Sequence, residues 1–300
     1  MRVAVTGSTG VLGRSVVPAL IDGGHDVIAL ARTTERGRIA ESLGATARVG
    51  TWSDVEAFAA QLDDCDAVCN LASHVPVGYA KTMPWSRRAT DALRTEGVRR
   101  VLAAARSAGI RRVIQESASC LYADGGDEWI NERSSLCINR ATEPISVGES
   151  LVQEFTCESR TGVVLRFGAV VCNEDQLHRV VRTGHVIGAG SPDSWAHVVH
   201  QDDVGPAVVA ALTAPSGVYN VGADPVRRAE LCEIYADAIG RKHFDPMGSL
   251  LAKLSGERSE PLTRSLRVSS SSFHNHTGWI PRHPEFDVSW LLRGITPRSA

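Results

Sequence analysis

Residues 2–13 read Arg2-Val-Ala-Val-Thr-Gly-Ser-Thr-Gly-Val-Leu-Gly13, a short apolar strand that runs into three spaced glycines. In this pattern Gly7 allows a tight turn, Gly10 lets a pyrophosphate approach the backbone, and Gly13 lets the next helix pack closely. The amides that begin this helix then point at the phosphates. The segment therefore predicts a dinucleotide-binding loop, and the alternative is a glycine-rich turn without a ligand. The loop residues assigned to the cofactor are Gly7, Thr9, Gly10, Val11, Leu12 and Gly13.

Composition limits the class of protein. The chain has 300 residues, 43% of them hydrophobic, and no apolar run long enough to cross a bilayer, so we expect one large globular domain or two coupled ones. A net charge of −2 gives no basic surplus, which argues against nucleic acid and anionic membranes as partners. Because a strand begins directly after Met1, we expect no signal peptide and a cytoplasmic protein. The expected partner is a small-molecule substrate.

The cysteines do not suggest a metal site. There are seven of them, an odd number, and they are scattered along the chain. Cys65 and Cys69 have neither the partners nor the spacing of a zinc site. We therefore expect reduced thiols and no metal.

Strands and helices are expected to alternate along the chain. After the first strand, further strands are expected at residues 26–31, 47–50, 66–72, 112–116, 163–167 and 218–221. Helices are expected at residues 15–22, around 58–62, at 85–108 and at 146–160. This order predicts an α/β fold with a doubly wound parallel sheet, the Rossmann arrangement.

The end of the second strand bears on the choice of cofactor. An acidic residue at this point would bind the ribose of NAD, whereas an arginine accommodates the 2′-phosphate of NADP. The chain has Arg32 here, so we expect NADP(H). Arg36 and Arg38 follow, and they either assist or form a solvated face. The other residues assigned to the cofactor, at or after this and the next two strands, are Thr33, Trp52, Leu71, Ala72 and Ser73.

Seven motifs then follow one another in a familiar order. They are Thr6-Gly-x-x-Gly-x-x-Gly13, Asn70-Leu-Ala72, Ser117-Ala-Ser-Cys-Leu-Tyr122, Leu165-Arg-Phe-Gly168, His197-Val-Val-His-Gln-Asp-Asp203, Val218-Tyr-Asn-Val-Gly222 and Gly278-Trp-Ile-Pro281. In these the chain resembles the extended short-chain dehydrogenase/reductases, the group of the NAD-dependent epimerases and dehydratases. The resemblance implies a Rossmann core at residues 1–171 and 198–223. It also implies a smaller substrate-binding region at residues 172–197 and 224–300.

The chain departs from this family at the catalytic positions. The family uses a tyrosine as proton donor, a lysine one turn later, and a serine or threonine that holds the substrate oxygen. The register of the helix at 146–160 puts the first two positions at Ser146 and Ser150. Counting back from Tyr122 puts the third at Ala118, and a slip of one residue would offer Ser117 or Ser119.

Nearby positions do not replace what is missing. The three lysines of the chain, Lys81, Lys242 and Lys253, all lie outside this helix. An asparagine that is common in the preceding helix of the family is replaced by Arg94. An aliphatic hydroxyl is far too weak an acid to stand in for a phenol beside a cation. No catalytic residue is therefore assigned firmly.

Three interpretations remain. In the first, the protein is a reductase whose substrate supplies its own acid, for example through a hydroxyl beside the ketone. Alternatively, the protein is an inert NADP-binding redox sensor or regulator, or it reduces an activated double bond. A full C-terminal region favours the first interpretation, since a sensor needs no elaborate substrate pocket. The residues expected to contact the substrate are His74, Ser119, Ser146, Trp195 and His197.

Members of the family with this departure resemble the tailoring ketoreductases of aromatic polyketide pathways. Within these, the loss of all three positions resembles the angucyclinone ketoreductases of simocyclinone-type antibiotic biosynthesis. The resemblance implies NADPH-dependent reduction of a polycyclic aromatic ketone. Family members often dimerise through the helices expected at 85–108 and 146–160, but the arginines of the first leave both monomer and homodimer open.

Overall fold

The computed structural model describes residues 1–73, 84–171, 190–242 and 260–292. Its centre is a seven-stranded sheet of order β10-β6-β5-β4-β1-β2-β3, in which all neighbouring strands are parallel. The strands are β1 (Arg2–Thr6), β2 (Asp26–Ala31), β3 (Thr46–Val49), β4 (Ala67–Asn70), β5 (Arg112–Ala118), β6 (Thr161–Phe167) and β10 (Gly217–Val221). The strand order reverses between β1 and β4, which confirms the predicted doubly wound α/β fold.

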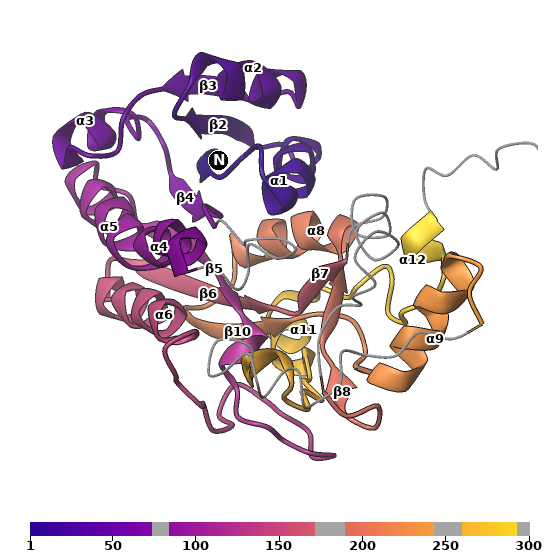
Figure 1. Cartoon of the computed structure of the whole chain (residues 1–300). Helices are drawn as coiled ribbons and strands as arrows, with labels where there is room; N and C mark the ends of the chain where they lie inside the picture. Colours follow the sequence, from indigo (N-terminus) through magenta and orange to yellow (C-terminus); the bar gives the residue numbers. More distant parts are fainter. Residues whose placement is uncertain (74–83, 172–189, 243–259, 293–300) are drawn as a thin grey trace, which may run out of the picture.

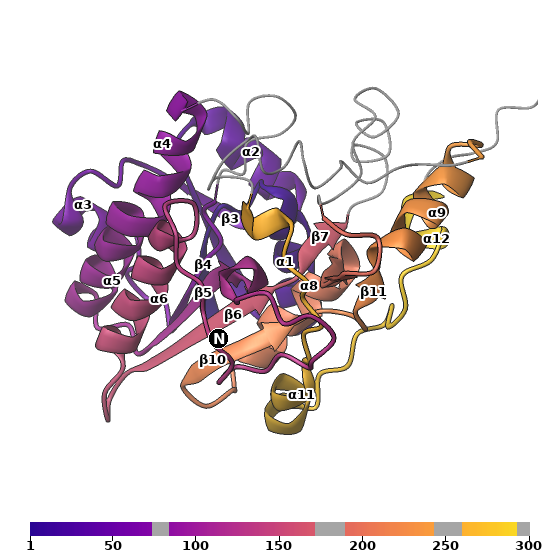
Figure 2. The ribbon, with the colours of Figure 1, turned by 60° about the horizontal axis from the view of Figure 1, so that its bottom comes forward.

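Helices cover both faces of this sheet (Figures 1 and 2). One face packs against α1 (Val11–Asp22) and α8 (Gln201–Ala211). The other face packs against α3 (Val55–Ala60), α5 (Val98–Ser107) and α6 (Glu143–Phe155). Two separate apolar cores result, one on each side, and strands buried on both faces are typical of parallel sheets.

The remaining elements lie around this centre. The helices are α2 (Thr34–Ser42), α4 (Pro84–Ala92), α9 (Arg228–Ala238), α11 (Ser271–Thr277) and α12 (Ser289–Leu292). Two short pairs of strands lie outside the main sheet. Strand β7 (Ala169–Val171) pairs with β9 (Val198–His200), and β8 (Trp195–Ala196) pairs with β11 (Val226–Arg227). In Figure 1, α9 and α12 lie together at one end of the molecule, far from β2 and β3. The predicted division into two regions stays a prediction.

The helix expected at residues 85–108 is present as one continuous helical segment, but with an irregularity that was not predicted. It consists of α4, a π-helical turn at Leu93–Gly97, and α5. A π turn holds one extra residue and leaves the apolar periodicity on either side intact, so the sequence pattern did not reveal it. At this turn α6 comes very close, because a Cβ on Gly148 would lie only 2.7 Å from the carbonyl oxygen of Arg94.

Other boundaries differ for local reasons. Helix α1 begins at Val11 rather than Ser15, because Gly10 already adopts the extended conformation of an N-cap. Helix α6 ends at Phe155 rather than Arg160, and the Oγ1 atom of Thr156 accepts a hydrogen bond from Gly162 instead of continuing the helix. The sequence reading missed α2, which Thr33 caps by accepting a hydrogen bond from the amide of Arg36.

The structure bears on two expectations drawn from the composition, one about the cysteines and one about membrane-spanning helices. The six cysteines that lie in described segments are all free thiols, and Cys172 falls outside them. Across the described ranges, none of the helices has both the length and the apolar character that crossing a membrane requires.

Candidate functional site

The glycine loop lies between β1 and α1, and two of its glycines are required by the protein itself. Gly7 has a φ of +67°, and a Cβ there would lie 2.6 Å from the carbonyl oxygen of Leu71. A Cβ on Gly13 would lie 2.3 Å from the carbonyl oxygen of Gly7. Any side chain at either position would therefore collide with the backbone.

Gly10 differs from these two. A Cβ there would meet only the carbonyl oxygen of Gly7, at 3.2 Å, and the residue is exposed. The neighbouring Val11 side chain is also unusually open, with an exposed fraction of 49%. Packing within the chain thus explains Gly7 and Gly13 but not Gly10. Open space over the start of α1 fits a pyrophosphate held by backbone amides.

Positive charge surrounds this loop. A guanidinium N–H of Arg36 donates to the hydroxyl oxygen of Thr9 at 3.2 Å, and Nε of Arg14 donates to the Thr9 carbonyl at 3.4 Å. Arg32 stands exposed directly after β2, where no carboxylate occurs. The sequence left the role of Arg36 open, and the newly found helix α2 is what brings it to the loop.

The other residues assigned to the cofactor fall into two groups. Leu71 and Ala72 follow β4 and lie against Gly7, and the amide of Ser73 donates to the Leu71 carbonyl at 2.9 Å in a tight turn. Trp52 instead stacks on Phe58 of α3, with ring centroids 5.5 Å apart, and is half-buried there. Its role toward a cofactor stays a prediction.

The three positions that the family resemblance assigns to the triad offer little acid chemistry. Ala118 ends β5, and Ser146 is half-buried on α6. Ser150 is exposed one turn later, and its hydroxyl donates to the backbone carbonyl of Ser146 at 3.1 Å. Ser119, the alternative for the third position, is buried.

The other alternative, Ser117, belongs to a buried polar network. Its hydroxyl donates to Oε1 of Glu149 at 2.5 Å. The guanidinium of Arg166 forms two hydrogen bonds with the same carboxylate, at 2.9 and 2.6 Å. Ser117 therefore connects β5 to α6 and is not free to contact a substrate. The sequence did not indicate this network.

Tyr122 is not a substitute acid. Its phenol donates to the side chain of Asn220 at 2.8 Å, and the Arg166 guanidinium lies 4.8 Å from its ring centre. The residue is fully buried, and burial raises the pKa of its hydroxyl. A phenol that is inaccessible, hydrogen-bonded and less acidic than usual is poorly suited to protonating a substrate.

A second buried ion pair lies next to these positions. In the π turn, Arg94 donates to Oε1 of Glu116 at 3.0 Å, and both side chains are about nine-tenths buried. The Nε and Nη1 atoms of Arg94 are buried without a hydrogen-bond partner among the described residues. Burial raises the pKa of Glu116. The sequence noted Arg94 as a replacement but did not predict its partner.

Trp195, which was assigned to the substrate, already has partners within the protein. The indole N–H of Trp195 donates to Asp127 at 3.0 Å, and the guanidinium carbons of Arg227 and Arg267 lie 3.9 and 4.7 Å from a Trp195 ring centre. Guanidinium groups therefore already occupy ring surface on which a planar substrate would stack. The substrate role of Trp195 stays a prediction.

His197 is only 3% exposed and packs against Gly222, where a Cβ would lie 2.0 Å from the imidazole Nε2. Neither ring nitrogen has a partner within the described segments. Burial lowers its pKa to about 3, so the ring is neutral at physiological pH. A substrate contact for His197 stays a prediction, and His74 lies outside the described residues.

Three potential metal ligands also meet near α8. His200, Asp202 and His283 have ligand atoms within 4.8 Å of one another. The His200 and His283 imidazole rings are in contact, with centroids 3.9 Å apart and planes tilted by 30°. Nδ1 of His200 accepts the amide of Asp202, and Nδ1 of His283 lies 3.1 Å from Asp203. These contacts fix the segment after α11 against α8, and the expectation of no metal stays a prediction.

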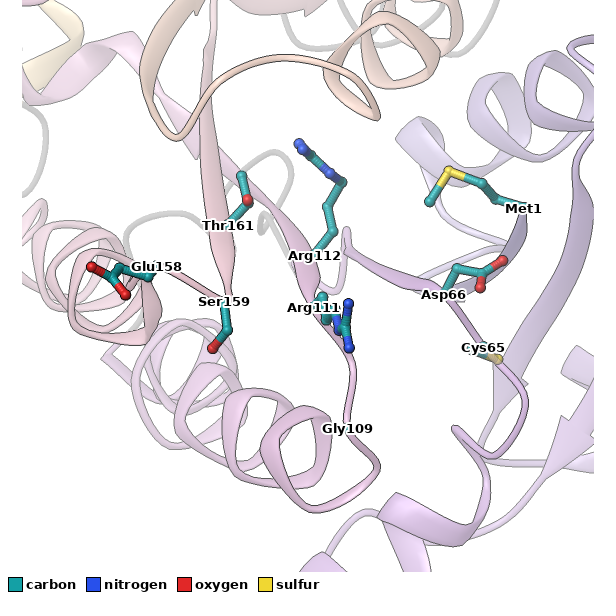
Figure 3. A pocket seen from close by; sticks show the side chains of 9 residues that line it. All are labelled: Met1, Cys65, Asp66, Gly109, Arg111, Arg112, Glu158, Ser159 and Thr161. Carbon is teal, nitrogen blue, oxygen red and sulfur yellow. The ribbon is translucent and has the colours of Figure 1, made fainter.

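A cavity of about 490 Å³ lies elsewhere (Figure 3). Its lining includes Met1 and Asp66, which precede β1 and β4, and the first residues of β5 and β6, Arg112 and Thr161. It therefore opens at the amino ends of the strands. Ligands of open parallel sheets bind beyond the carboxyl ends, where the glycine loop and the triad positions are, so this cavity is separate from the candidate site.

Comparison with known proteins agrees with this geometry. A family model described as NAD(P)H-binding matches residues 7–215. A 3-diazoavenalumate denitrifying reductase of a Streptomyces species is 29% identical, over 95% of this chain and 98% of its own length. A 4-hydroxy-2-methyl-3-oxo-4-farnesyl-3,4-dihydroquinoline-1-oxide ketoreductase of Stigmatella aurantiaca is 36% identical, over 42% of this chain and 36% of its own.

Among solved structures, a short-chain dehydrogenase/reductase superfamily protein of Agrobacterium tumefaciens with bound NAD has a similar fold. The TM-score is 0.74 at 22% identity, and the match covers 98% of this chain and 95% of that one. Its sheet and helix arrangement corresponds to the one described above.

Proposed function

The chain belongs to the NAD(P)H-binding family, and from this we propose that it is an NADPH-dependent ketoreductase for a polycyclic aromatic ketone that supplies its own acid. The proposed substrate is of the angucyclinone type, with a hydroxyl next to the ketone. The proposed setting is the biosynthesis of an aromatic polyketide antibiotic. The relatives named as a reductase and a ketoreductase support a reductive reaction.

One observation carries the proposal, namely that the positions for acid catalysis hold Ala118, Ser146 and Ser150. Hydride transfer to a carbonyl carbon moves the π electrons onto oxygen, and the resulting alkoxide must take up a proton. Serine hydroxyls are too weakly acidic for this step near neutral pH, and Tyr122 is buried with a raised pKa. A phenol held beside the ketone has both the acidity and the position.

In this mechanism the protein orients the cofactor and the ketone and supplies no reacting group of its own. The backbone around Gly10 and the start of α1 would hold the pyrophosphate, and the bound NADPH supplies the hydride. The ends of β5 and α6 form the side of the site where the ketone would be placed. The substrate hydroxyl donates its proton to the new alkoxide and recovers one from water after release.

The arginines at the loop favour NADPH over NADH. Arg32 is exposed directly after β2 and Arg36 contacts the loop at Thr9, and the proposal is that they bind a 2′-phosphate, since charge-assisted hydrogen bonds between guanidinium and phosphate are strong. We therefore expect tighter binding of NADPH than of NADH by titration calorimetry, and Arg32→Asp should reverse or abolish the difference. Arg38→Asp, at an exposed position of the following helix α2, is the matched control. Equal affinities of the unmutated protein for both cofactors would refute this preference.

The activity itself is tested by incubating the protein with NADPH and a panel of aromatic polyketide ketones. We expect oxidation of NADPH together with formation of the corresponding secondary alcohol, identified by mass spectrometry. An inert NADP-binding sensor would bind the cofactor and oxidise none of it with any ketone. A product reduced at a carbon–carbon double bond would instead favour the activated-alkene alternative.

A further inference from the structure

The starting point is the buried guanidinium of Arg94. One of its nitrogens pairs with Glu116 at 3.0 Å, while Nε and Nη1 have no acceptor among the residues that the structure describes. The side chain is about nine-tenths buried. Buried donors are nearly always satisfied, and leaving a charged one without an acceptor is costly. The arrangement therefore lacks an acceptor.

The position of Arg94 connects it to the candidate site from two sides. Its carbonyl oxygen lies against Gly148, which stands midway between Ser146 and Ser150 on α6. Its partner Glu116 precedes Ala118 by two residues on β5. Arg94 therefore lies between the two segments that carry the triad positions. It does so from a π-helical turn, a feature that often occurs at functional sites.

The missing acceptor is not a phosphate of the cofactor. The glycine loop follows β1, and β4 separates β1 from β5 in the sheet. Arg14, Arg32 and Arg36 already surround that loop. An acceptor at the carboxyl end of β5 would belong to the reacting end of the site, and this step rests on the proposed function.

We propose that Arg94 is a positioning residue for the reduction: through a water bound to its free N–H groups, it stabilises the negative charge on the substrate oxygens. Hydride transfer places an electron pair on the ketone oxygen, the neighbouring phenol gives it a proton, and a phenolate remains. Arg94 keeps its own proton throughout. Its charge lowers the energy of the alkoxide and of the phenolate, both of which are anionic.

The simplest alternative is that Arg94 only neutralises Glu116. The double variant Arg94→Gln, Glu116→Gln separates the two roles, because it removes both charges and keeps two side chains that can hydrogen-bond to each other. Arg94→Lys keeps the charge. Arg99→Gln, an exposed position on the next helical segment, is the matched control.

The experiment measures single-turnover reduction of a phenolic aromatic ketone at saturating NADPH, with thermal melts and NADPH affinity recorded for each variant. The double variant should bind NADPH normally and reduce the ketone about tenfold more slowly. Across one water the guanidinium would lie about 5 Å from the anion and the Glu116 carboxylate about 4 Å farther away, and at an effective dielectric near 20 the attraction exceeds the repulsion by an amount of this order. Arg94→Lys should recover most of the rate, and Arg99→Gln should leave it unchanged.

A spectroscopic measurement distinguishes an electrostatic effect of Arg94 on the substrate from a structural effect of its replacement. In the dead-end complex with NADP⁺, the absorbance of the bound phenolic ketone reports its ionisation, and its pKa should be higher in the double variant than in the unmutated protein. Equal rates and equal bound-phenol pKa values in both proteins would overturn the inference while leaving the proposed function intact. Failure of the unmutated protein to reduce any phenolic ketone would overturn both.

Discussion

Gly10 is the glycine of the loop whose identity the packing of the described residues does not explain. Replacing it with valine should weaken NADPH binding by about a hundredfold or more, because the side chain occupies the space where the pyrophosphate must approach. The melting temperature of the free protein should change little, since only one atom lies within 4 Å of the added Cβ. Titration calorimetry and a thermal melt measure the two effects.

The matched control is Gly13→Ala. Its Cβ would lie 2.3 Å from a backbone oxygen, so this variant should lose stability even without cofactor. If Gly10→Val still bound NADPH normally, the phosphates would have to lie elsewhere.

His197 makes a prediction about pH. Its pKa is lowered by burial from 6.5 to about 3, so the unfolded chain binds this proton more readily than the folded one. Stability should therefore fall as the pH drops below about 6.5, by about 1.4 kcal/mol per unit, until about pH 3. Urea unfolding of His197→Phe should show a weaker loss between about pH 7 and about pH 4.5 than the unmutated protein. Identical pH dependence would mean that His197 is not held neutral.

Among the elements, α6 is joined to the sheet by a buried ion pair as well as by apolar packing. Glu149 of α6 accepts hydrogen bonds from Arg166 of β6 and Ser117 of β5, so three elements meet at one carboxylate. Glu149→Gln should lower the free energy of unfolding by about 3–5 kcal/mol, because it leaves the Arg166 charge buried without a counter-ion.

Glu96→Gln is the control for this variant, because Glu96 is exposed and pairs with arginines on its own helix. It should leave the denaturation curve unchanged. If Glu149→Gln were equally harmless, the network would not be what fixes α6 against the sheet.

The same elements show where sequence reasoning succeeds and where it stops. Apolar runs and spaced glycines predicted the strands and the loop, because burial on both faces and close backbone contacts restrict residue type at those positions. The π turn around Arg94 and the partners of Glu149 were not predictable, since each depends on contacts between segments distant in the sequence. Helix α2 was missed because its mean hydropathy is low and it buries little apolar surface.

At the scale of the whole molecule, the sheet order β10-β6-β5-β4-β1-β2-β3 brings the glycine loop and the triad positions to one edge. The motif order in the sequence predicted this arrangement. It did not predict that two arginines would contact the Trp195 ring or that His197 would be buried, because both depend on the packing of the C-terminal strands. The substrate side of the site was therefore less predictable than the cofactor side.

In the proposed reaction the proton for reduction comes from the substrate. This source of the proton is tested most directly by single-turnover NADPH oxidation with a phenolic aromatic ketone and with its methyl ether, in the unmutated protein and in Ser117→Ala, Ser119→Ala, Ser146→Ala and Ser150→Ala. Masking the hydroxyl should slow reduction by about a hundredfold or more, as expected for loss of a general acid. Each serine variant should stay within about tenfold of the unmutated rate, a difference of about 1.4 kcal/mol. An inactive serine variant, together with a methyl ether that reacts as fast as the free phenol, would contradict the account.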